Sequence, residues 1–140
     1  LLRKKGNEFG ATTGRPRRCG WLDIPALKYA IMLNGVTQLI MMKSDVLSGF
    51  DKLKVCTKYK YRGQLIDYVP YDVVNEPIEP VYEEVDGWNE ALDHVTDIDE
   101  LPQALHNYIA YIEKATGLPI TIVSVGPDRK QTMLRDVMVK

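Results

Sequence analysis

The chain has 140 residues, of which 45% are hydrophobic and 26% are charged, and its formal net charge at pH 7 is −1. This composition is typical of one folded domain with at most a small appendage, and it excludes a mainly disordered chain. The near-zero net charge disfavours nucleic-acid or membrane binding through bulk charge, and the longest apolar run, around 39–42, is too short to cross a bilayer.

The first predicted elements are a loop, a helix and a strand. Residues 6–20 contain four glycines without apolar periodicity, which indicates an ordered loop. Asp23 is a good N-cap for a helix that Gly35 ends. The apolar run 37–42 predicts a short strand covered on both faces, and the polar segment 43–49 is expected to be a loop at its carboxyl end.

Strand periodicity returns in the middle of the chain. Alternating side chains over 53–61, a turn at 62–63 and a return over 64–69 predict an antiparallel hairpin. Prolines interrupt 69–80, which is therefore expected to be irregular, and a further short strand is expected over 81–85.

The last third predicts a helix and a strand. Apolar residues at helical spacing from Leu101 indicate an amphipathic helix that ends at Gly117, and 120–125 is the strongest strand in the chain. A helix, strand, hairpin, helix and strand in this order indicate an α/β domain with at least two central strands. Strands that lack neighbours within the chain are expected to leave exposed edges and apolar patches.

Charge is segregated along the chain. Residues 1–18 contain six Lys or Arg against the single acid Glu8, whereas 63–113 contain no Lys or Arg and 67–100 supply twelve of the nineteen acids. The acidic middle is expected to be a solvated face. The basic front mixes its charges with glycines and hydroxyls, and that mixture can wrap a phosphate.

Cysteine and histidine usage gives no sign of a metal centre. Cys19 and Cys56 lie far apart without a Cys-x-x-Cys pair, so we expect neither a disulfide scaffold nor a zinc site, and a reducing cytoplasmic location fits best. His94 and His106 have no nucleophile or metal partner at useful spacing, so we expect both to be structural or exposed.

Residues 10–18 are the first segment that can carry chemistry. Its hydroxyls and forked guanidinium donors suit carboxylate or phosphate, and glycine lets the backbone approach a ligand closely. The spacing is not that of a Walker loop. An exposed basic loop is an equally good interpretation. The candidate ligand-binding residues are Ala11, Thr12, Thr13, Gly14, Arg15, Pro16 and Arg17.

Two further segments follow the predicted inner strands. After the first strand, Asp45 can accept both donors of a guanine edge, and the stem of Lys43 can lie over the base. A surface ion pair or a turn-capping Asp explains the same residues, with Ser44 between them at an outward position. After the second strand come Ser124, Val125 and Gly126, which an ordinary Gly-Pro turn also explains. If the two strands are parallel neighbours, both segments line one base pocket.

The run Gly-Asn-Glu-Phe-Gly-Ala-Thr-Thr-Gly-Arg-Pro-Arg-Arg-Cys-Gly-Trp-Leu-Asp, residues 6–23, resembles the substrate-loop signature of the adenylosuccinate synthetase family. The likeness extends in order over essentially the whole chain. It continues through residues 42–47, 79–83, 87–88, 101–105, 107–109, 116–120 and 124–129.

This resemblance implies a ligase with a P-loop-NTPase-like α/β fold, a central and mostly parallel sheet, and an antiparallel hairpin. It implies that GTP phosphorylates the 6-oxygen of IMP, and that the amine of L-aspartate then displaces the phosphate to give adenylosuccinate, the first committed step of AMP synthesis. Mg²⁺ as cofactor, GTP as co-substrate and a homodimer are implied with it.

Residue by residue, the resemblance implies that 11–17 bind aspartate and IMP, with Arg15 reaching IMP and Arg17 reaching the GTP phosphates. The implied GTP-binding residues are Arg17, Lys43, Ser44, Asp45, Ser124, Val125 and Gly126. The family's phosphate loop, Mg²⁺ ligands and catalytic Asp and His lie near its amino terminus and are absent here. We therefore expect the carboxyl-terminal portion of such an enzyme, with no catalytic residue or metal ligand of its own.

The expected portion divides into four parts. These are the substrate loop (1–22), a helix, strand and guanine-binding loop (23–50), a hairpin and acidic irregular region (51–100), and a helix, strand and base-pocket loop (101–140).

Two alternative functions stay open. One is a non-catalytic guanine-nucleotide-binding module, and the other is RNA or phosphate binding by the basic front, which would weaken steeply with salt.

Overall fold

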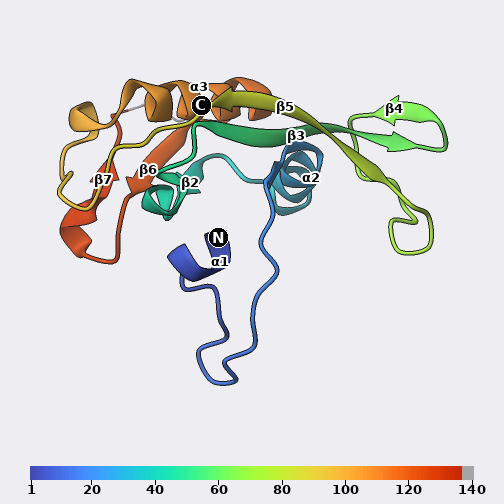
Figure 1. The fold of residues 1–140 in the computed structure, drawn as a ribbon. Coiled ribbons are helices and arrows are strands. Elements are labelled where there is room, and N and C mark those ends of the chain that lie inside the picture. The colour runs from blue at the N-terminus through green and yellow to red at the C-terminus, as the bar shows by residue number, and fades with distance from the viewer. Residues whose placement is uncertain (137–140) are drawn as a thin grey trace.

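A computed structural model describes residues 1–136 of the chain, so the last four residues of the predicted 101–140 segment lie outside the described part. Two sheets and two long helices make up the fold (Figure 1). The elements in chain order are α1 (Leu2–Lys5), β1 (Leu22–Asp23), α2 (Ile24–Asn34), β2 (Leu39–Met41), η1 (Ser44–Leu47), β3 (Lys52–Tyr61), β4 (Gln64–Ile66), β5 (Glu79–Asp86), η2 (Ile98–Glu100), α3 (Gln103–Thr116), β6 (Ile120–Ser124), η3 (Arg129–Gln131) and β7 (Thr132–Leu134).

The two sheets are mixed, which confirms the α/β class. In the first sheet, β3 pairs in parallel with β1 and antiparallel with β4 and β5, and the predicted hairpin is the β3–β4 pair. In the second sheet, β6 lies between β2 and β7. The predicted inner strands are parallel neighbours, with Leu39 opposite Ile120 and Met41 opposite Val123. The carboxyl ends of β2 and β6 therefore meet at one edge of the sheet.

The start of α2 is fixed by one carboxylate. Asp23 caps the helix as predicted, since its Oδ1 accepts from the backbone N–H of Ala26 at 2.9 Å. The hydroxyl of Tyr59 on β3 donates to the same carboxylate at 2.6 Å, and burial together with this carboxylate raises the pKa of Tyr59. Gly35 ends α2 in the left-handed conformation, at φ 60°.

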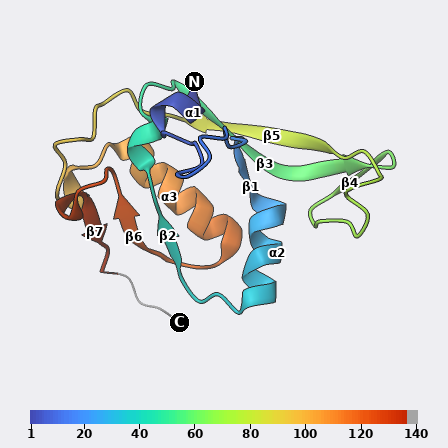
Figure 2. The same cartoon turned by 90° about the horizontal axis from the view of Figure 1, so that it is seen from below.

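The helix α3 provides much of the hydrophobic core. It buries one stripe of side chains, as its periodicity predicts, and Gly117 ends it at φ 74°. In Figure 2, α3 crosses the molecule beside the short strands of the second sheet. The buried stripe consists of Leu105, Tyr108, Ile109 and Ile112. Each such side chain contributes about 1.5–3 kcal/mol through burial, so this stripe decides where the second sheet lies.

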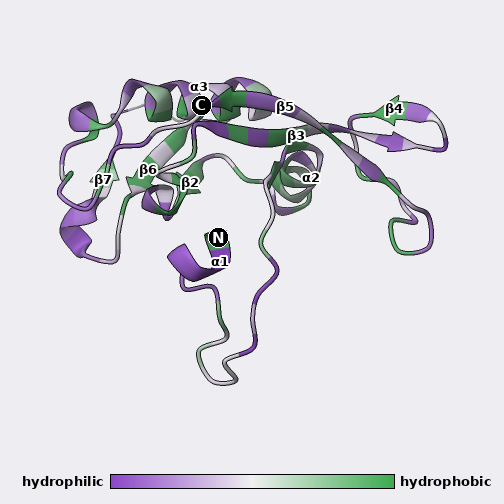
Figure 3. Cartoon of the chain, in the orientation of Figure 1, coloured by the Kyte–Doolittle hydropathy of each residue, from purple (hydrophilic) through white to green (hydrophobic). Residues whose placement is uncertain are grey.

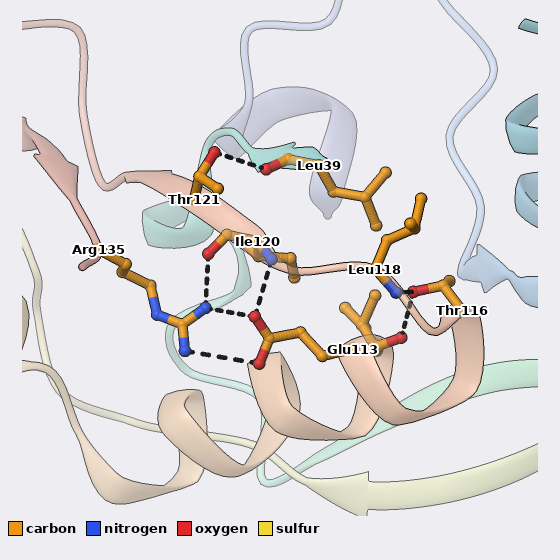
Figure 4. Close-up of polar contacts among 8 residues, drawn as sticks. Leu39, Glu113, Thr116, Leu118, Ile120, Thr121 and Arg135 are labelled. Atoms are coloured by element: carbon orange, nitrogen blue, oxygen red, sulfur yellow. Dashed lines mark hydrogen bonds and ion pairs between the residues drawn. The ribbon is translucent and has the colours of Figure 1, made fainter. Parts of the chain in front are cut away.

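A polar cluster fixes the first residue of β6 against α3 (Figure 4). The Glu113 carboxylate accepts from the backbone N–H of Ile120 at 2.7 Å and from Arg135 Nη1 at 2.6 Å. Arg135 Nη1 also donates to the carbonyl of Ile120 at 2.5 Å. These side chains are about four-fifths buried. Charge-assisted contacts in such surroundings are stronger than exposed ones, so the start of β6 is rigidly placed.

The acids of β5 lie opposite the lysines of β3. Antiparallel register places Lys52 against Asp86, and their side chains form an ion pair at 2.5 Å. Lys54 with Glu84 and Lys60 with Glu79 repeat this arrangement at 3.9 Å. Part of the acidic middle is thus paired across strands instead of only solvated. Pairs this exposed contribute little to stability, but they fix the strand register.

The prediction that the strand at 37–42 is covered on both faces is wrong. The strand β2 is three residues long and lies at the edge of its sheet, and Ile40 is 55% exposed. Met32 and Leu33 of α2 are also more than half exposed, and both elements carry hydrophobic colour in Figure 3. An apolar run indicates that a strand favours burial, but it does not show which elements of the fold cover each face. The predicted exposed edges and apolar patches are present.

Other departures are small. The strands β1 and β7 were not predicted, because two and three residues are too few to show a period. The returning hairpin strand ends at Ile66, whereas β5 is longer than expected and includes Pro80. Within the predicted polar loop 43–49, the short turn η1 forms.

We predict that Asp23→Ala lowers the free energy of unfolding by about 1–3 kcal/mol, because it removes a helix cap and an acceptor of a half-buried hydroxyl. Urea denaturation of Asp23→Ala, Tyr59→Phe and the double variant measures the effect. The double variant should be less destabilised than the sum of the single variants, since both remove one shared contact. Additive losses would show that the two residues do not act together.

Candidate functional site

The carboxyl ends of β2 and β6 open into one cavity of about 510 Å³. Lys43 and Asp45 line it from the end of β2, and Ser124 and Gly126 line it from the end of β6. The end of α1 and the residues that follow it close a further side, through Lys5, Gly6 and Asn7. The parallel pairing thus brings together two segments that lie about eighty residues apart in the sequence.

Asp45 brings an unpaired acceptor to this cavity. Its Oδ1 is buried and has no hydrogen-bond partner among the described residues. A buried acceptor without a donor costs about 1–3 kcal/mol, so a ligand whose N–H groups reach this carboxylate would offset that cost. A carboxylate here can receive two N–H donors that lie side by side on one edge of a planar ligand.

The Ser124–Gly126 segment forms a tightly held wall. Ser124 is 2% exposed, and its Oγ donates to the carbonyl of Gly126 at 3.0 Å. Val125 is buried behind the cavity and donates its N–H to the carbonyl of Gln131 at 3.0 Å. A Cβ at Gly126 would lie 2.2 Å from Gln131 Oε1, and that side chain is already engaged by Asp128 in a capping box. A side chain at residue 126 would therefore displace Gln131 and disturb the capping box.

Lys43 is held in a fixed orientation at the cavity. Its backbone adopts the left-handed region, with φ 58°. Its Nζ donates to Glu8 Oε1 at 2.6 Å and to the carbonyl of Gly6 at 2.7 Å. The second carboxylate oxygen of Glu8 accepts from Arg17 Nη1 at 3.0 Å. The two cations, Lys43 foremost, lower the pKa of Glu8, so the carboxylate stays ionised at neutral pH.

The predicted ligand loop is a narrow hairpin-like excursion. Its base is closed by the pair Phe9 and Pro16 and by hydrogen bonds from Arg17 N–H to Glu8 and from Gly10 N–H to Arg15. Gly14 turns the tip at φ 64°. Residues 11–17 are all exposed, and Figure 1 shows the loop projecting on the side of the molecule opposite α3. Ala11, Thr12, Thr13 and Arg15 thus lie on a projecting arm rather than in the cavity wall.

The expectation that Ser44 points outward is wrong. Ser44 is 1% exposed, and its Oγ has no hydrogen-bond partner among the described residues. It lines a separate apolar cavity of about 250 Å³, beside Leu27, Tyr108 and Ile112. A 3₁₀ turn rotates successive side chains by about 120°, so Asp45 and Ser44 face different cavities. The sequence does not show that these two adjacent side chains point in different directions.

The position of Glu8 could not be predicted from the sequence. Glu8 is the single acid among six basic residues of the front, and the structure places its carboxylate between the cavity residue Lys43 and the loop residue Arg17. That isolation in a basic segment is the one signal that could have indicated it. The contact with Lys43 spans 35 residues, and no local pattern shows it.

The described residues show few other candidates. Within 1–136, no three His, Cys, Asp or Glu side chains gather closely enough to hold a metal ion. His94 is exposed beside Asp93, and both cysteines are free, Cys19 exposed and Cys56 buried. None of the helices in this part of the chain is long and apolar enough to cross a membrane.

Over nearly its whole length, the chain is similar to adenylosuccinate synthetases. The family model described as adenylosuccinate synthetase matches residues 1–133. Adenylosuccinate synthetases of Christiangramia forsetii and Cytophaga hutchinsonii are 63% and 57% identical, over 94% and 96% of this chain. The chain spans only 31% and 32% of the length of those two relatives.

The fold agrees with the same comparison. The solved structure of a fully ligated adenylosuccinate synthetase from Plasmodium falciparum matches with a TM-score of 0.89 and 42% sequence identity. That match covers 96% of this chain and 33% of the other.

The two buried serines give a matched pair of predictions. Ser44→Ala should leave the protein as stable as before or more stable by about 1 kcal/mol, because it removes a buried hydroxyl that makes no hydrogen bond. Ser124→Ala should destabilise it by about 1 kcal/mol, because it removes the contact with Gly126. Thermal and urea unfolding measure both. Equal losses in the two variants would contradict the different surroundings of the two hydroxyls.

Proposed function

Because this chain belongs to the adenylosuccinate synthetase family, we propose that it binds the guanine base of GTP and carries the loop that receives IMP and L-aspartate. In the proposed reaction of the whole enzyme, the 6-oxygen of IMP attacks the γ-phosphorus of GTP and GDP leaves. The amine of aspartate then forms a bond to carbon 6, and the carbon–oxygen bond to phosphate breaks, which gives adenylosuccinate.

The single observation that carries this proposal is that Asp45, whose Oδ1 makes no hydrogen bond among the described residues, lines the same 510 Å³ cavity as Lys43 and Ser124. Guanine presents N1–H and its exocyclic amine side by side, and one carboxylate accepts from both. Adenine presents an acceptor at N1, so it would leave the carboxylate unpaired. That difference of about 1–3 kcal/mol corresponds to roughly five- to hundredfold discrimination.

Lys43 and the β6 wall complete the proposed base site. Lys43 Nζ is held by Glu8 and by the Gly6 carbonyl, which leaves its aliphatic stem to cover the base. Ser124 and Gly126 line the cavity from the end of β6 and supply its other wall. Ser44 contributes through the position of the η1 turn, because its side chain faces the other cavity.

The projecting loop supplies the proposed groups for the anionic reactants. Arg15 and Arg17 offer forked donors that match carboxylate and phosphate oxygens, and Thr12 and Thr13 add hydroxyls. Their exposure suits a loop that meets its ligands from solvent. Cationic donors aimed at a transferring phosphoryl group stabilise its developing charge.

Mg²⁺ would neutralise phosphate charge during the transfer, but the described residues provide no cluster of ligands for it. The resemblance places the metal ligands and the catalytic acid and base near the amino terminus of such enzymes, so we assign none of them to this chain. The homodimer and the cytoplasmic location belong to the same proposal for the whole enzyme.

Asp45→Asn tests the base site. It should weaken GTP binding about tenfold and abolish the preference for GTP over ATP, because an amide replaces one acceptor with a donor. A competition titration of a fluorescent GTP analogue with GTP and with ATP measures both affinities. Asp86→Asn, which changes an exposed acid paired with Lys52, is the matched control and should keep the preference. If Asp45→Asn discriminates as well as the original protein, Asp45 does not read the base.

The purified 140-residue chain should release no phosphate from GTP in the presence of IMP, aspartate and Mg²⁺, because positioned metal and phosphate-binding groups dominate phosphoryl transfer. A phosphate-release assay with each substrate omitted in turn measures this. Release that requires all three substrates would show that catalytic groups are present in these residues.

A further inference from the structure

We propose that Glu8 is a positioning residue that couples the base cavity to the ligand loop, by holding Lys43 and Arg17 on its two carboxylate oxygens. The inference rests on the proposed function and adds to it a route between two parts of the site. Through this route, a guanine nucleotide bound at the cavity restrains the loop that receives the other substrates.

The geometry of the bridge is specific. Lys43 Nζ donates to Oε1 at 2.6 Å, while Arg17 Nη1 donates to Oε2 at 3.0 Å, so each cation has an oxygen of its own. The Glu8 side chain is 24% exposed, against 52% for Lys43 and 58% for Arg17. The carboxylate is thus the least exposed of the three charged groups, and it lies between the other two.

The backbone around Glu8 leaves little freedom for its movement. Its N–H donates to the carbonyl of Arg3 at 2.9 Å, and its carbonyl accepts from the N–H of Arg17 at 3.0 Å. Arg3 Nε also donates to the carbonyl of Arg17 at 2.6 Å. The base of the loop is therefore fastened to the segment that borders the cavity, and a restraint on Lys43 reaches Arg17 through one side chain.

The charges explain why a carboxylate suits this position. One anion stands between two cations, so the trio keeps a net positive charge toward an incoming anionic ligand. Glutamine would keep an acceptor for one cation but would turn an N–H₂ group toward the other, and no orientation of the amide satisfies both. Glu8→Gln therefore removes the bridge with little change in side-chain volume.

Trypsin provides a direct readout of loop restraint. The bond between Arg18 and Cys19 lies at the end of the exposed loop, and neither residue takes part in the bridge. Cleavage of this bond is followed by mass spectrometry with and without saturating GTP, and GTP binding to each variant is measured separately by titration. Guanosine is a second probe, because it occupies the base cavity without phosphates that could contact arginine directly.

In the original protein, GTP and guanosine should each slow this cleavage by about two- to fivefold, the range expected for a solvent-accessible ion-pair link. In Glu8→Gln, the protection should be lost. Glu8→Asp keeps the charge on a shorter side chain and should restore part of it. Glu84→Gln, which removes an exposed acid paired with Lys54 on the first sheet, is the matched control and should protect normally.

Lys43→Met gives an independent check. If the bridge carries the coupling, Glu8→Gln should change the cleavage rate of ligand-free protein more in the original background than in Lys43→Met, where only the contact with Arg17 is left to lose. Equal protection in the original protein and Glu8→Gln, or equal effects of Glu8→Gln in both backgrounds, would overturn the coupling while leaving the base site intact. Failure of the original protein to bind GTP would overturn the proposed function and this inference together.

Discussion

The parallel pairing of β2 with β6 is the constraint on which the site depends. It places Asp45 and the Ser124–Gly126 segment at one edge of a sheet, although the sequence separates them widely. The pairing is itself fixed from α3, whose Glu113 binds both the first N–H of β6 and Arg135. A hydrophobic stripe and one buried ion pair thus determine the shape of a polar cavity.

The cavity and the projecting loop differ in how firmly they are built. The cavity lies at strand ends and short turns and includes the buried, hydrogen-bonded Ser124, whereas every residue from 11 to 17 is exposed. This contrast fits a division of work in which one part recognises a rigid base and the other meets flexible anionic reactants. Glu8 joins the two parts, and only one side chain is needed because both cations reach it.

Rules that depend only on neighbouring residues predicted the helix ends and the hairpin turn. Asp23, Gly35 and Gly117 begin and end helices because capping depends on adjacent residues, and the hairpin turn at 62–63 was predicted for the same reason. An apolar run and a segment of strong strand formers also predicted the strands that became β2 and β6, and the motif positions after them indicated a shared cavity. The site assignments made from the resemblance remain proposals, although the structure brings Lys43, Asp45, Ser124 and Gly126 together.

The features that were missed depend on contacts between distant parts of the chain. Ser44 is buried where the short turn η1 meets β6, and Ile40 is exposed because nothing described covers that side of β2. The contact of Glu8 with Lys43 joins residues that lie 35 positions apart. No pattern within a few residues contains that information.

The central claim is that Asp45 accepts from two donors on the edge of guanine. Equilibrium binding of GTP, ITP and ATP to the unaltered chain tests it most directly, because ITP keeps N1–H but lacks the exocyclic amine. Affinity should fall at each step of that series, by about fivefold or more for each donor removed. Equal affinities for the three nucleotides would contradict recognition of the base by this carboxylate.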